Sequence, residues 1–295
     1  MRPNQCFALL PLLLVSTLAQ AATTVPLPDW VCGSGDAMFR SGFEADEAIP
    51  HDPSNGSGGA YPGNQTRTIA VPGVGNRTFY LRLPPDYTPT RSWPLLLALH
   101  GATGSASTAP AAAQQLRSDW SGWADTRGFI VLAAVASGSQ GGWNPTVDIP
   151  TISAALDDTA ARYDVEQSRI SLWGFSAGAH VAHALALNNT DYFASYAVSA
   201  GSLEAFACTD DGSFPPTCSA LLSGAQPKIP VDIHLGNTDP LYTTYGAGGD
   251  PARFQSGGWV LGQDLFYTLF AGGHTYTVAQ LGEIWTNICP FALGP

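Results

Sequence analysis

A serine between two closely spaced glycines is the group in this chain best suited to act as a nucleophile. Ser176 is the centre of a Gly-Phe-Ser-Ala-Gly pentapeptide at residues 174–178, preceded by a short apolar run and followed by an alanine-rich stretch without proline. Strand, tight turn and helix in this order are the pattern of a nucleophile elbow, in which small residues permit the sharp turn. The hydroxyl would then lie at a helix N-terminus, where backbone N–H groups favour developing negative charge.

Two further groups would complete the chemistry of such a serine. A base must accept its proton, and a carboxylate must orient that base. In enzymes with this elbow the acid follows the serine and the histidine comes last. Asp239 lies in a turn just beyond the apolar run 231–235, where catalytic groups of open α/β sheets are found, and we expect it to be the acid. His274 lies in a glycine-rich loop after the apolar run 265–270, and we expect it to be the base.

The remaining histidines after the serine are expected to have structural roles. His180 and His183 belong to the helix that leaves the elbow, and we expect them to point away from the catalytic end of the sheet as packed or capping residues. His234 falls inside the strand-like run 231–235, where packing is the expected role.

An oxyanion hole requires two N–H donors aimed at the charge that develops on the attacked carbonyl. The amide of Ala177, the residue after the nucleophile, is expected to be one donor. The second is expected in the loop after the apolar run 94–100, where either Ala102 or Thr103 could supply it. In the same loop, His100 is expected to shape the backbone rather than to take part in catalysis.

The elements that must position these groups alternate along the chain. Runs typical of strands cover residues 66–71, 77–83, 94–100, 129–135, 169–173, 195–200 and 231–235. Helical patterns lie between them, and one of these begins at Pro150-Thr151 with Ile152 and Leu156 on one face. This alternation predicts an α/β fold with a mostly parallel central sheet flanked by helices.

The chain divides into three parts. Residues 1–21 carry Arg2 as their only charge, then an apolar run and an Ala-Gln-Ala cleavage site, and they predict a secretory signal peptide. Residues 22–65 show little periodicity and predict an extended leader or linker. Residues 66–295 have the length of one catalytic domain. We therefore expect a secreted, extracellular protein, with the bacterial periplasm as the alternative.

The composition argues against two classes of partner. The formal net charge is −11, and Lys228 is the one lysine in the chain. This balance disfavours binding to nucleic acid or to an anionic membrane surface. The mature segment also lacks a run of 18 uninterrupted apolar residues, the approximate length of a membrane span. We expect a monomer that binds neither nucleic acid nor membrane.

Four cysteines follow the predicted signal peptide, and their spacing matches no zinc motif. An even number of cysteines in an exported protein favours disulfides, of which three connectivities are possible here. We favour a short loop closed by Cys208 and Cys218, with Cys32 joined to Cys289 near the end of the chain. No metal and no cofactor are expected.

Five motifs, in order, resemble those of a known family. They are Leu97-Ala98-Leu99-His100-Gly101, Gly141-Gly142-Trp143-Asn144 with Val147-Asp148, the pentapeptide 174–178, His234-Leu235-Gly236-Asn237-Thr238-Asp239 and Gly272-Gly273-His274. Together they resemble the secreted polyhydroxybutyrate depolymerase and feruloyl esterase family of α/β-hydrolases. The resemblance covers about residues 66 to 290.

This resemblance implies an α/β-hydrolase fold and a cofactor-free site in which Ser176, Asp239 and His274 are nucleophile, acid and base. It also implies that Trp143 lies beside the substrate pocket and that Asp148 helps to hold the Trp143 loop. The chain departs from the family pattern in carrying Ala102 where a cysteine is common and Leu235 within the usual His-Gly pair.

The predicted function is that of a secreted serine esterase acting through an acyl-enzyme on a small-molecule or polymeric ester. An acetylxylan esterase or a serine peptidase on the same fold is the nearest alternative. A non-catalytic polymer- or carbohydrate-binding protein is the alternative from another class. Tyr242, Tyr245 and Trp259 could line a substrate groove or could pack, and we favour packing.

Overall fold

The structure is a computed structural model that describes residues 24–26, 32, 50–60, 62–211 and 216–294. The predicted signal peptide, residues 1–21, lies outside the described residues, as does most of the predicted leader, residues 22–65. None of the helices in the described ranges combines the length and the apolar character that crossing a membrane requires.

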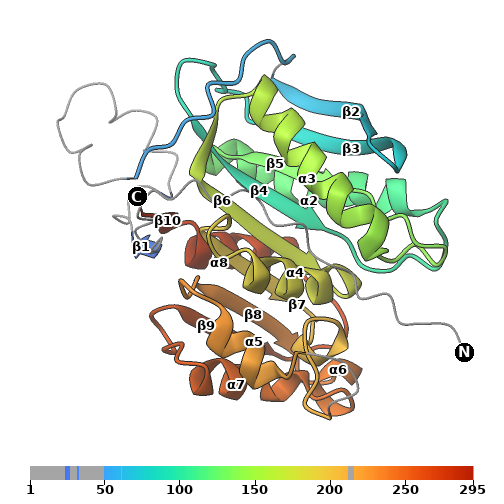
Figure 1. Ribbon diagram of the computed structural model, residues 1–295, viewed down its shortest axis with the longest axis vertical. Coiled ribbons are helices and arrows are strands. Elements are labelled where there is room, and N and C mark those ends of the chain that lie inside the picture. Colours follow the sequence, from blue (N-terminus) through green and yellow to red (C-terminus); the bar gives the residue numbers. More distant parts are fainter. Residues whose placement is uncertain (1–23, 27–31, 33–49, 61, 212–215, 295) are drawn as a thin grey trace, which may run out of the picture.

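A twisted sheet runs through the centre of the molecule (Figure 1). Within the described residues it has eight strands, in the spatial order β2 (Gly63–Val71), β3 (Gly75–Leu83), β5 (Ile130–Ala134), β4 (Trp93–Leu99), β6 (Val165–Phe175), β7 (Ser195–Ser199), β8 (Val231–Gly236) and β9 (Leu265–Phe270). Strand β3 is antiparallel to both of its neighbours, and the strands from β5 to β9 are parallel. Strands β5, β7 and β8 are buried along their whole length and β4 is buried except at Pro94, as expected of parallel strands covered on both faces. The predicted mostly parallel sheet is confirmed.

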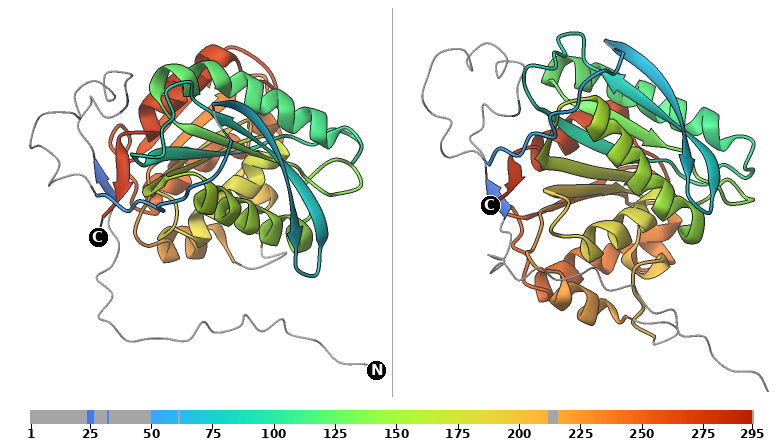
Figure 2. Two further views of the ribbon diagram at one scale, coloured as in Figure 1. Left: turned by 90° about the horizontal axis from the view of Figure 1, so that it is seen from above. Right: turned by 45° about the horizontal axis from the view of Figure 1, so that its top comes forward.

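Helices cover both faces of the sheet (Figure 2). On one face lie α2 (Ala109–Arg127) and α8 (Val278–Ile288), over a core that includes Trp120, Trp173 and Trp285. Helix α2 packs against β3, β4 and β5, and α8 packs against β7 and β8. On the other face lie α3 (Pro145–Arg162), α4 (Ala177–Asn188), α5 (Cys218–Gly224) and α7 (Asp250–Ser256). The hydrophobic core between these helices and the sheet is larger than the core on the first face. The sheet is therefore held rigid from both sides, and its strand ends form a firm base for a site.

Helix α3 begins earlier than the sequence pattern indicated. Its first residue is Pro145, and the Asn144 side chain accepts the N–H of Thr146, so the predicted start at Pro150-Thr151 was wrong. Asparagine followed by proline is a strong helix start because asparagine caps free N–H groups and proline lacks one. Pro150 lies inside the helix.

The described parts of the predicted leader contact the catalytic domain. Strand β2 begins at Gly63, three residues before the predicted start at residue 66. Residues 52–54 lie along the beginning of β6, where the Ser54 N–H donates to the Val165 carbonyl at 2.8 Å. At the opposite end of the leader, β1 (Thr24–Pro26) pairs antiparallel with β10 (Phe291–Leu293).

Both favoured disulfides are present. Cys208 is bonded to Cys218, and Cys32 is bonded to Cys289. The first bond closes a loop that ends at α5, and the second ties the leader to the end of α8. All four cysteines are buried.

Candidate active site

The elbow has the geometry that its glycines predict. Strand β6 ends at Phe175, helix α4 begins at Ala177, and Ser176 between them has φ 54° and ψ −120°. This backbone region is costly for a residue with a Cβ, and such strain is common at active sites. A Cβ at Gly178 would collide with the Leu99 carbonyl, and one at Gly174 would collide with the backbone of Gly178. Only glycine fits at these two positions.

Ser176, His274 and Asp239 come together from three separate strand ends. His274 Nε2 lies 2.7 Å from Ser176 Oγ, and His274 Nδ1 lies 2.9 Å from Asp239 Oδ2. Asp239 is fully buried, whereas the His274 side chain is 39% exposed. The other oxygen of Asp239, Oδ1, accepts the N–H of Leu241 at 2.8 Å, so the carboxylate caps α6 (Pro240–Thr243). This arrangement can orient the imidazole and pass the serine proton to it.

The loops after β8 and β9 are joined backbone to backbone, which explains why Asp239 and His274 meet. The Asn237 N–H donates to the Phe270 carbonyl at 2.9 Å, and the Thr238 N–H donates to the Gly272 carbonyl at 2.9 Å. A Cβ at Gly236 would collide with the carbonyl of Gly272. A chain without glycine at position 236 could not bring the two loops this close.

The two candidates for the second oxyanion donor differ in their hydrogen bonding. The Thr103 N–H donates to the Gly141 carbonyl at 3.3 Å. The Ala102 N–H has no acceptor within the described part of the chain, and Ala102 is exposed. The loop passes beside the nucleophile, because a Cβ on Gly101 would lie 3.0 Å from the Cβ of Ser176. Ala177 contributes the first N–H of α4, a position at which a helix supplies no acceptor.

His100 shapes this loop, as the sequence predicts. Its Nδ1–H donates to the Gly101 carbonyl at 2.7 Å, and its Nε2 accepts the N–H of Ala136 at 3.1 Å. Burial lowers the pKa of His100, so the ring stays neutral and can donate with one nitrogen and accept with the other. The indole N–H of Trp143 donates to the His100 carbonyl at 2.8 Å.

Trp143 is held in turn by the buried carboxylate of Asp148. Asp148 Oδ2 accepts the N–H of Asn144 at 2.7 Å and that of Ser137 at 3.1 Å. Asp148 therefore supports the Trp143 loop, as the resemblance implies. The indole of Trp143 contacts the ring and the carbonyl of His100, whose loop passes beside Ser176.

A cavity of about 610 Å³ lies beside the loop that carries Asp239, and it was not anticipated from the sequence. It is lined by His180, Ser202, Glu204, Ala205, Thr209, Asp211, Leu241, Thr244, Tyr245 and Gly246. The expectation that His180 points away from the catalytic end was wrong. Burial lowers the pKa of His180, and the charge of the neighbouring His274 lowers it further. The spacing of one helical turn from Ser176 is the signal that could have placed His180 on this side of α4.

The other structural expectations differ in outcome. His183 is fully buried with its Nδ1 3.1 Å from the Tyr196 hydroxyl, and burial lowers its pKa to about 3. His234 is buried beside Asp232, so packing is confirmed for both histidines. Trp259 also packs, with its indole N–H donating to a backbone carbonyl, whereas Tyr245 is 62% exposed and lines the cavity.

Among the described residues, no three His, Cys, Asp or Glu side chains are grouped so as to hold a metal ion.

The sheet order, the helices on both faces and the strand–serine–helix elbow define an α/β-hydrolase. The Esterase family model (“Putative esterase”) matches residues 74–240, which is more than half of the chain. The chain belongs to this family, and the protein is a carboxylic ester hydrolase. No curated protein matches the chain.

Several solved structures share the fold. A ferulic acid esterase is 14% identical, with a TM-score of 0.57 over 77% of this chain and 97% of its own. A mutant of the feruloyl esterase module from Clostridium thermocellum, complexed with sinapinate, is 12% identical, with a TM-score of 0.57 over 84% of this chain and 95% of its own. An S-formylglutathione hydrolase from Agrobacterium tumefaciens is 17% identical, with a TM-score of 0.51 over 78% of this chain and 94% of its own.

Proposed function

We propose that the protein is an exported serine esterase in which Ser176 is the nucleophile. The observation that carries this proposal is the chain of hydrogen bonds from Ser176 through His274 to Asp239, at 2.7 and 2.9 Å. His274 takes the hydroxyl proton as Ser176 Oγ attacks the ester carbonyl, and it then gives that proton to the leaving alcohol. Water hydrolyses the acyl-enzyme by the same route in reverse. Asp239 stabilises the imidazolium that forms in both steps.

The proposed oxyanion hole consists of the N–H groups of Ala177 and Ala102. Ala177 is favoured because it follows the nucleophile at the start of α4. Ala102 is favoured over Thr103 because the Thr103 N–H already donates to Gly141. Trp143 and Asp148 support this loop, and a substrate bound at Ser176 would lie close to Trp143.

The substrate is proposed to be a carboxylic ester of the kind cleaved by feruloyl esterases or polyhydroxybutyrate depolymerases. Two similar structures are of feruloyl esterases, and the five motifs of the sequence support the same choice. Export to an oxidising compartment is supported by the two disulfides. We propose an extracellular monomer that binds neither nucleic acid nor membranes.

Hydrolysis of a small ester panel tests this proposal. The panel contains p-nitrophenyl acetate, p-nitrophenyl butyrate, methyl ferulate and emulsified polyhydroxybutyrate, with acetylated xylan and a peptide anilide for the alternatives. The proposal predicts turnover of the ferulate or the polymer that disappears in Ser176→Ala. Preference for acetylated xylan would indicate an acetylxylan esterase, and preference for the anilide would indicate a serine peptidase. A folded protein that cleaves no member of the panel would support the binding-protein alternative.

A further inference from the structure

The walls of the cavity include residues of the elements that carry the proposed catalytic groups. His180 lies one helical turn after Ser176 on α4, and it lines the cavity. Leu241 donates its N–H to Asp239 and also lines the cavity. Ser202 follows β7, whose Ser199 carbonyl accepts the N–H of Ser176 at 3.0 Å. A substrate held at the nucleophile would therefore extend one of its parts into this space.

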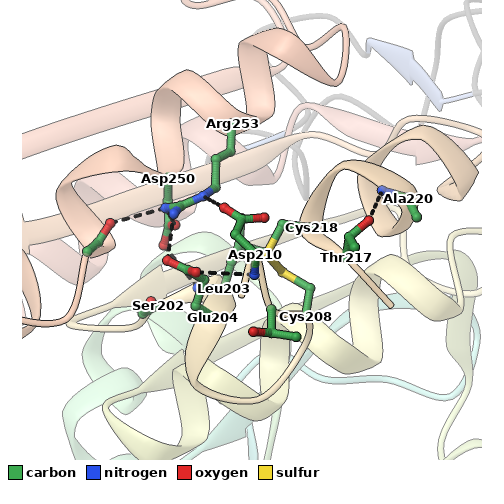
Figure 3. Close-up of a disulfide and its surroundings, with 12 residues drawn as sticks. Ser202, Leu203, Glu204, Cys208, Asp210, Thr217, Cys218, Ala220, Asp250 and Arg253 are labelled. Atoms are coloured by element: carbon green, nitrogen blue, oxygen red, sulfur yellow. Dashed lines mark hydrogen bonds and ion pairs between the residues drawn. A yellow bond between two sulfur atoms is a disulfide. The ribbon is translucent and has the colours of Figure 1, made fainter. Parts of the chain in front are cut away.

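The fixed charges around the cavity are mostly negative. Glu204 and Asp211 line it, and none of the described lining residues is a lysine or an arginine. Arg253 lies behind the wall, where it pairs with Glu204, with Asp210 at 3.0 Å and with the buried Asp250 at 3.0 Å. Figure 3 shows this guanidinium surrounded by the three carboxylates next to the Cys208–Cys218 disulfide.

The charge of the described groups around the cavity stays negative even when Asp250 is protonated. Burial raises the pKa of Asp250 to about 7, so this group can be neutral near that pH. Among the described residues, the carboxylates of Glu204, Asp210 and Asp211 then still outnumber the guanidinium of Arg253. His180 adds no charge, because burial lowers its pKa. An anionic group entering the cavity would be repelled, and a cationic group would be attracted.

Two polar atoms in the wall have hydrogen-bonding capacity that the described residues leave unused. The Ser202 N–H lies 3.0 Å from His180 Nδ1. The same nitrogen lies 3.2 Å from the Ser202 carbonyl oxygen, so both backbone groups of Ser202 face Nδ1. Nε2 has no partner in the described ranges. The Ser202 side chain is buried, and its Oγ also lacks a partner among the described residues. A buried unpaired hydroxyl is costly unless a ligand or water satisfies it.

We propose that this cavity selects the ester by charge: it binds a cationic or uncharged polar part of the substrate and excludes an anionic one. The carboxylates of Glu204 and Asp211 set the sign of the preference. Ser202 and His180 supply the hydrogen bonds. The proposal rests on the proposed esterase function, since it places this part of the substrate beside Ser176.

Three thioacetates of nearly equal shape test the preference on the leaving-group side. They carry a 2-trimethylammonioethyl, a 3,3-dimethylbutyl or a 2-sulfonatoethyl group, which are cationic, neutral and anionic. The expected order of kcat/KM is cationic above neutral above anionic, with at least about a tenfold span at low ionic strength that shrinks in 0.5 M salt. Comparison of p-nitrophenyl butyrate with mono-p-nitrophenyl glutarate tests the same preference on the acyl side.

The acidic residues themselves are tested by substitution. Asp211→Asn, and Glu204→Gln combined with it, are expected to raise the kcat/KM of the anionic substrate relative to the neutral one. Asp86→Asn removes an equal charge from a surface loop where Asp86 pairs with Arg91, and it should leave the ratio unchanged. Thermal unfolding of each variant shows that the fold is retained.

Two results would overturn the proposal: equal kcat/KM for the neutral and anionic members of both series, or a ratio that the Asp211 and Glu204 variants leave unchanged. Loss of all ester hydrolysis would instead overturn the proposed function. The charge preference can still be measured in that case, by calorimetric binding of the three thioacetates to the Ser176→Ala variant. The same order of affinities supports the cavity proposal, and equal affinities contradict it.

Discussion

Strand β6 has a hydrogen-bonded polar side chain at each end, Glu166 near its start and Ser176 directly after its last residue. The two side chains have different roles. At the first end, Glu166 is buried and accepts hydrogen bonds from four groups: His51, the Asp52 N–H, Ser92 and Ser168. At the other end, Ser176 has a strained backbone conformation, and its hydroxyl forms a hydrogen bond with the partly exposed His274.

The difference lies in how much hydrogen-bonding capacity the protein uses for itself. Every partner of Glu166 is a protein group, and the result is that residues 51–52 are fixed to β6. Near Ser176, the N–H of Ala102 and the hydroxyl of Ser202 have no protein partner in the described ranges. This contrast follows the general rule that α/β sheets bind ligands at the carboxyl ends of their strands.

The largest effect is expected at the carboxyl end of β6. Ser176→Ala should lower kcat by about 10³-fold or more, because the nucleophile is lost while the oxyanion donors remain. Stability should be unchanged or slightly higher. Steady-state hydrolysis of p-nitrophenyl butyrate and thermal unfolding measure the two properties. Ser118→Ala on the exposed face of α2 is the matched control, and an active Ser176→Ala protein would refute the assignment.

Asp239→Asn is expected to have the next largest effect on activity. An amide cannot stabilise the imidazolium and favours the wrong tautomer of His274, so kcat should fall by about 10³- to 10⁴-fold. The asparagine oxygen can still accept the Leu241 N–H, so the fold should persist. A rate within threefold of the wild type would show that Asp239 only caps α6.

At the opposite end of β6, Glu166→Gln should reduce stability but not activity. Burial alone would raise the pKa of Glu166, but hydrogen bonds from the Asp52 backbone and from Ser92 and Ser168 outweigh it and hold the pKa below its ordinary value. A carboxyl whose pKa is lowered on folding stabilises the folded state at pH values above its unfolded-state pKa. That stabilisation is lost as the pH falls through the folded-state pKa. At pH 7 the variant should lose about 2 kcal/mol of unfolding free energy.

Urea unfolding at pH 7 and at pH 3 measures this contribution. The gap in unfolding free energy between the wild type and Glu166→Gln should narrow as the pH is lowered, because protonation of the wild-type carboxyl removes its charge. kcat/KM at pH 7 should stay within about twofold of the wild type. A gap of the same size at both pH values would show that the charge of Glu166 is not what stabilises this end.

Expressed as a free energy, the smallest effect is expected for Trp143→Phe. The substitution removes the hydrogen bond to the His100 carbonyl, worth about 1 kcal/mol, and loosens the loop that carries Ala102. We expect kcat/KM to fall by about three- to tenfold with little change in KM, since an oxyanion donor acts mainly on the transition state. A rise in KM alone would instead indicate that Trp143 contacts bound substrate.

The sequence predicts those features of the fold and the site that a few neighbouring residues encode. The apolar runs gave the strands, and the glycines around Ser176 gave the elbow, because each signal lies within a few neighbouring residues. Asp239 and His274 were predictable from chain order and from their loops after apolar strands. Helix α3 begins before the Pro150-Thr151 pattern predicts, because Asn144-Pro145 is the stronger start signal.

Neither the cavity nor the hydrogen bonds around Glu166 could be predicted from neighbouring residues in the sequence. His180, Glu204 and Tyr245 come from three segments that meet only in the folded chain. Glu166 finds His51 across a separation of 115 residues. Nothing in the local composition around either residue predicts that contact.

Covalent labelling with a fluorophosphonate probe tests the central claim most directly, because such probes report an activated serine irrespective of substrate. The account predicts one adduct per chain by intact-mass spectrometry, located by peptide mapping at Ser176 and absent from Ser176→Ala and from denatured protein. A folded protein that takes up no probe, or one that is labelled at a different serine, would contradict it.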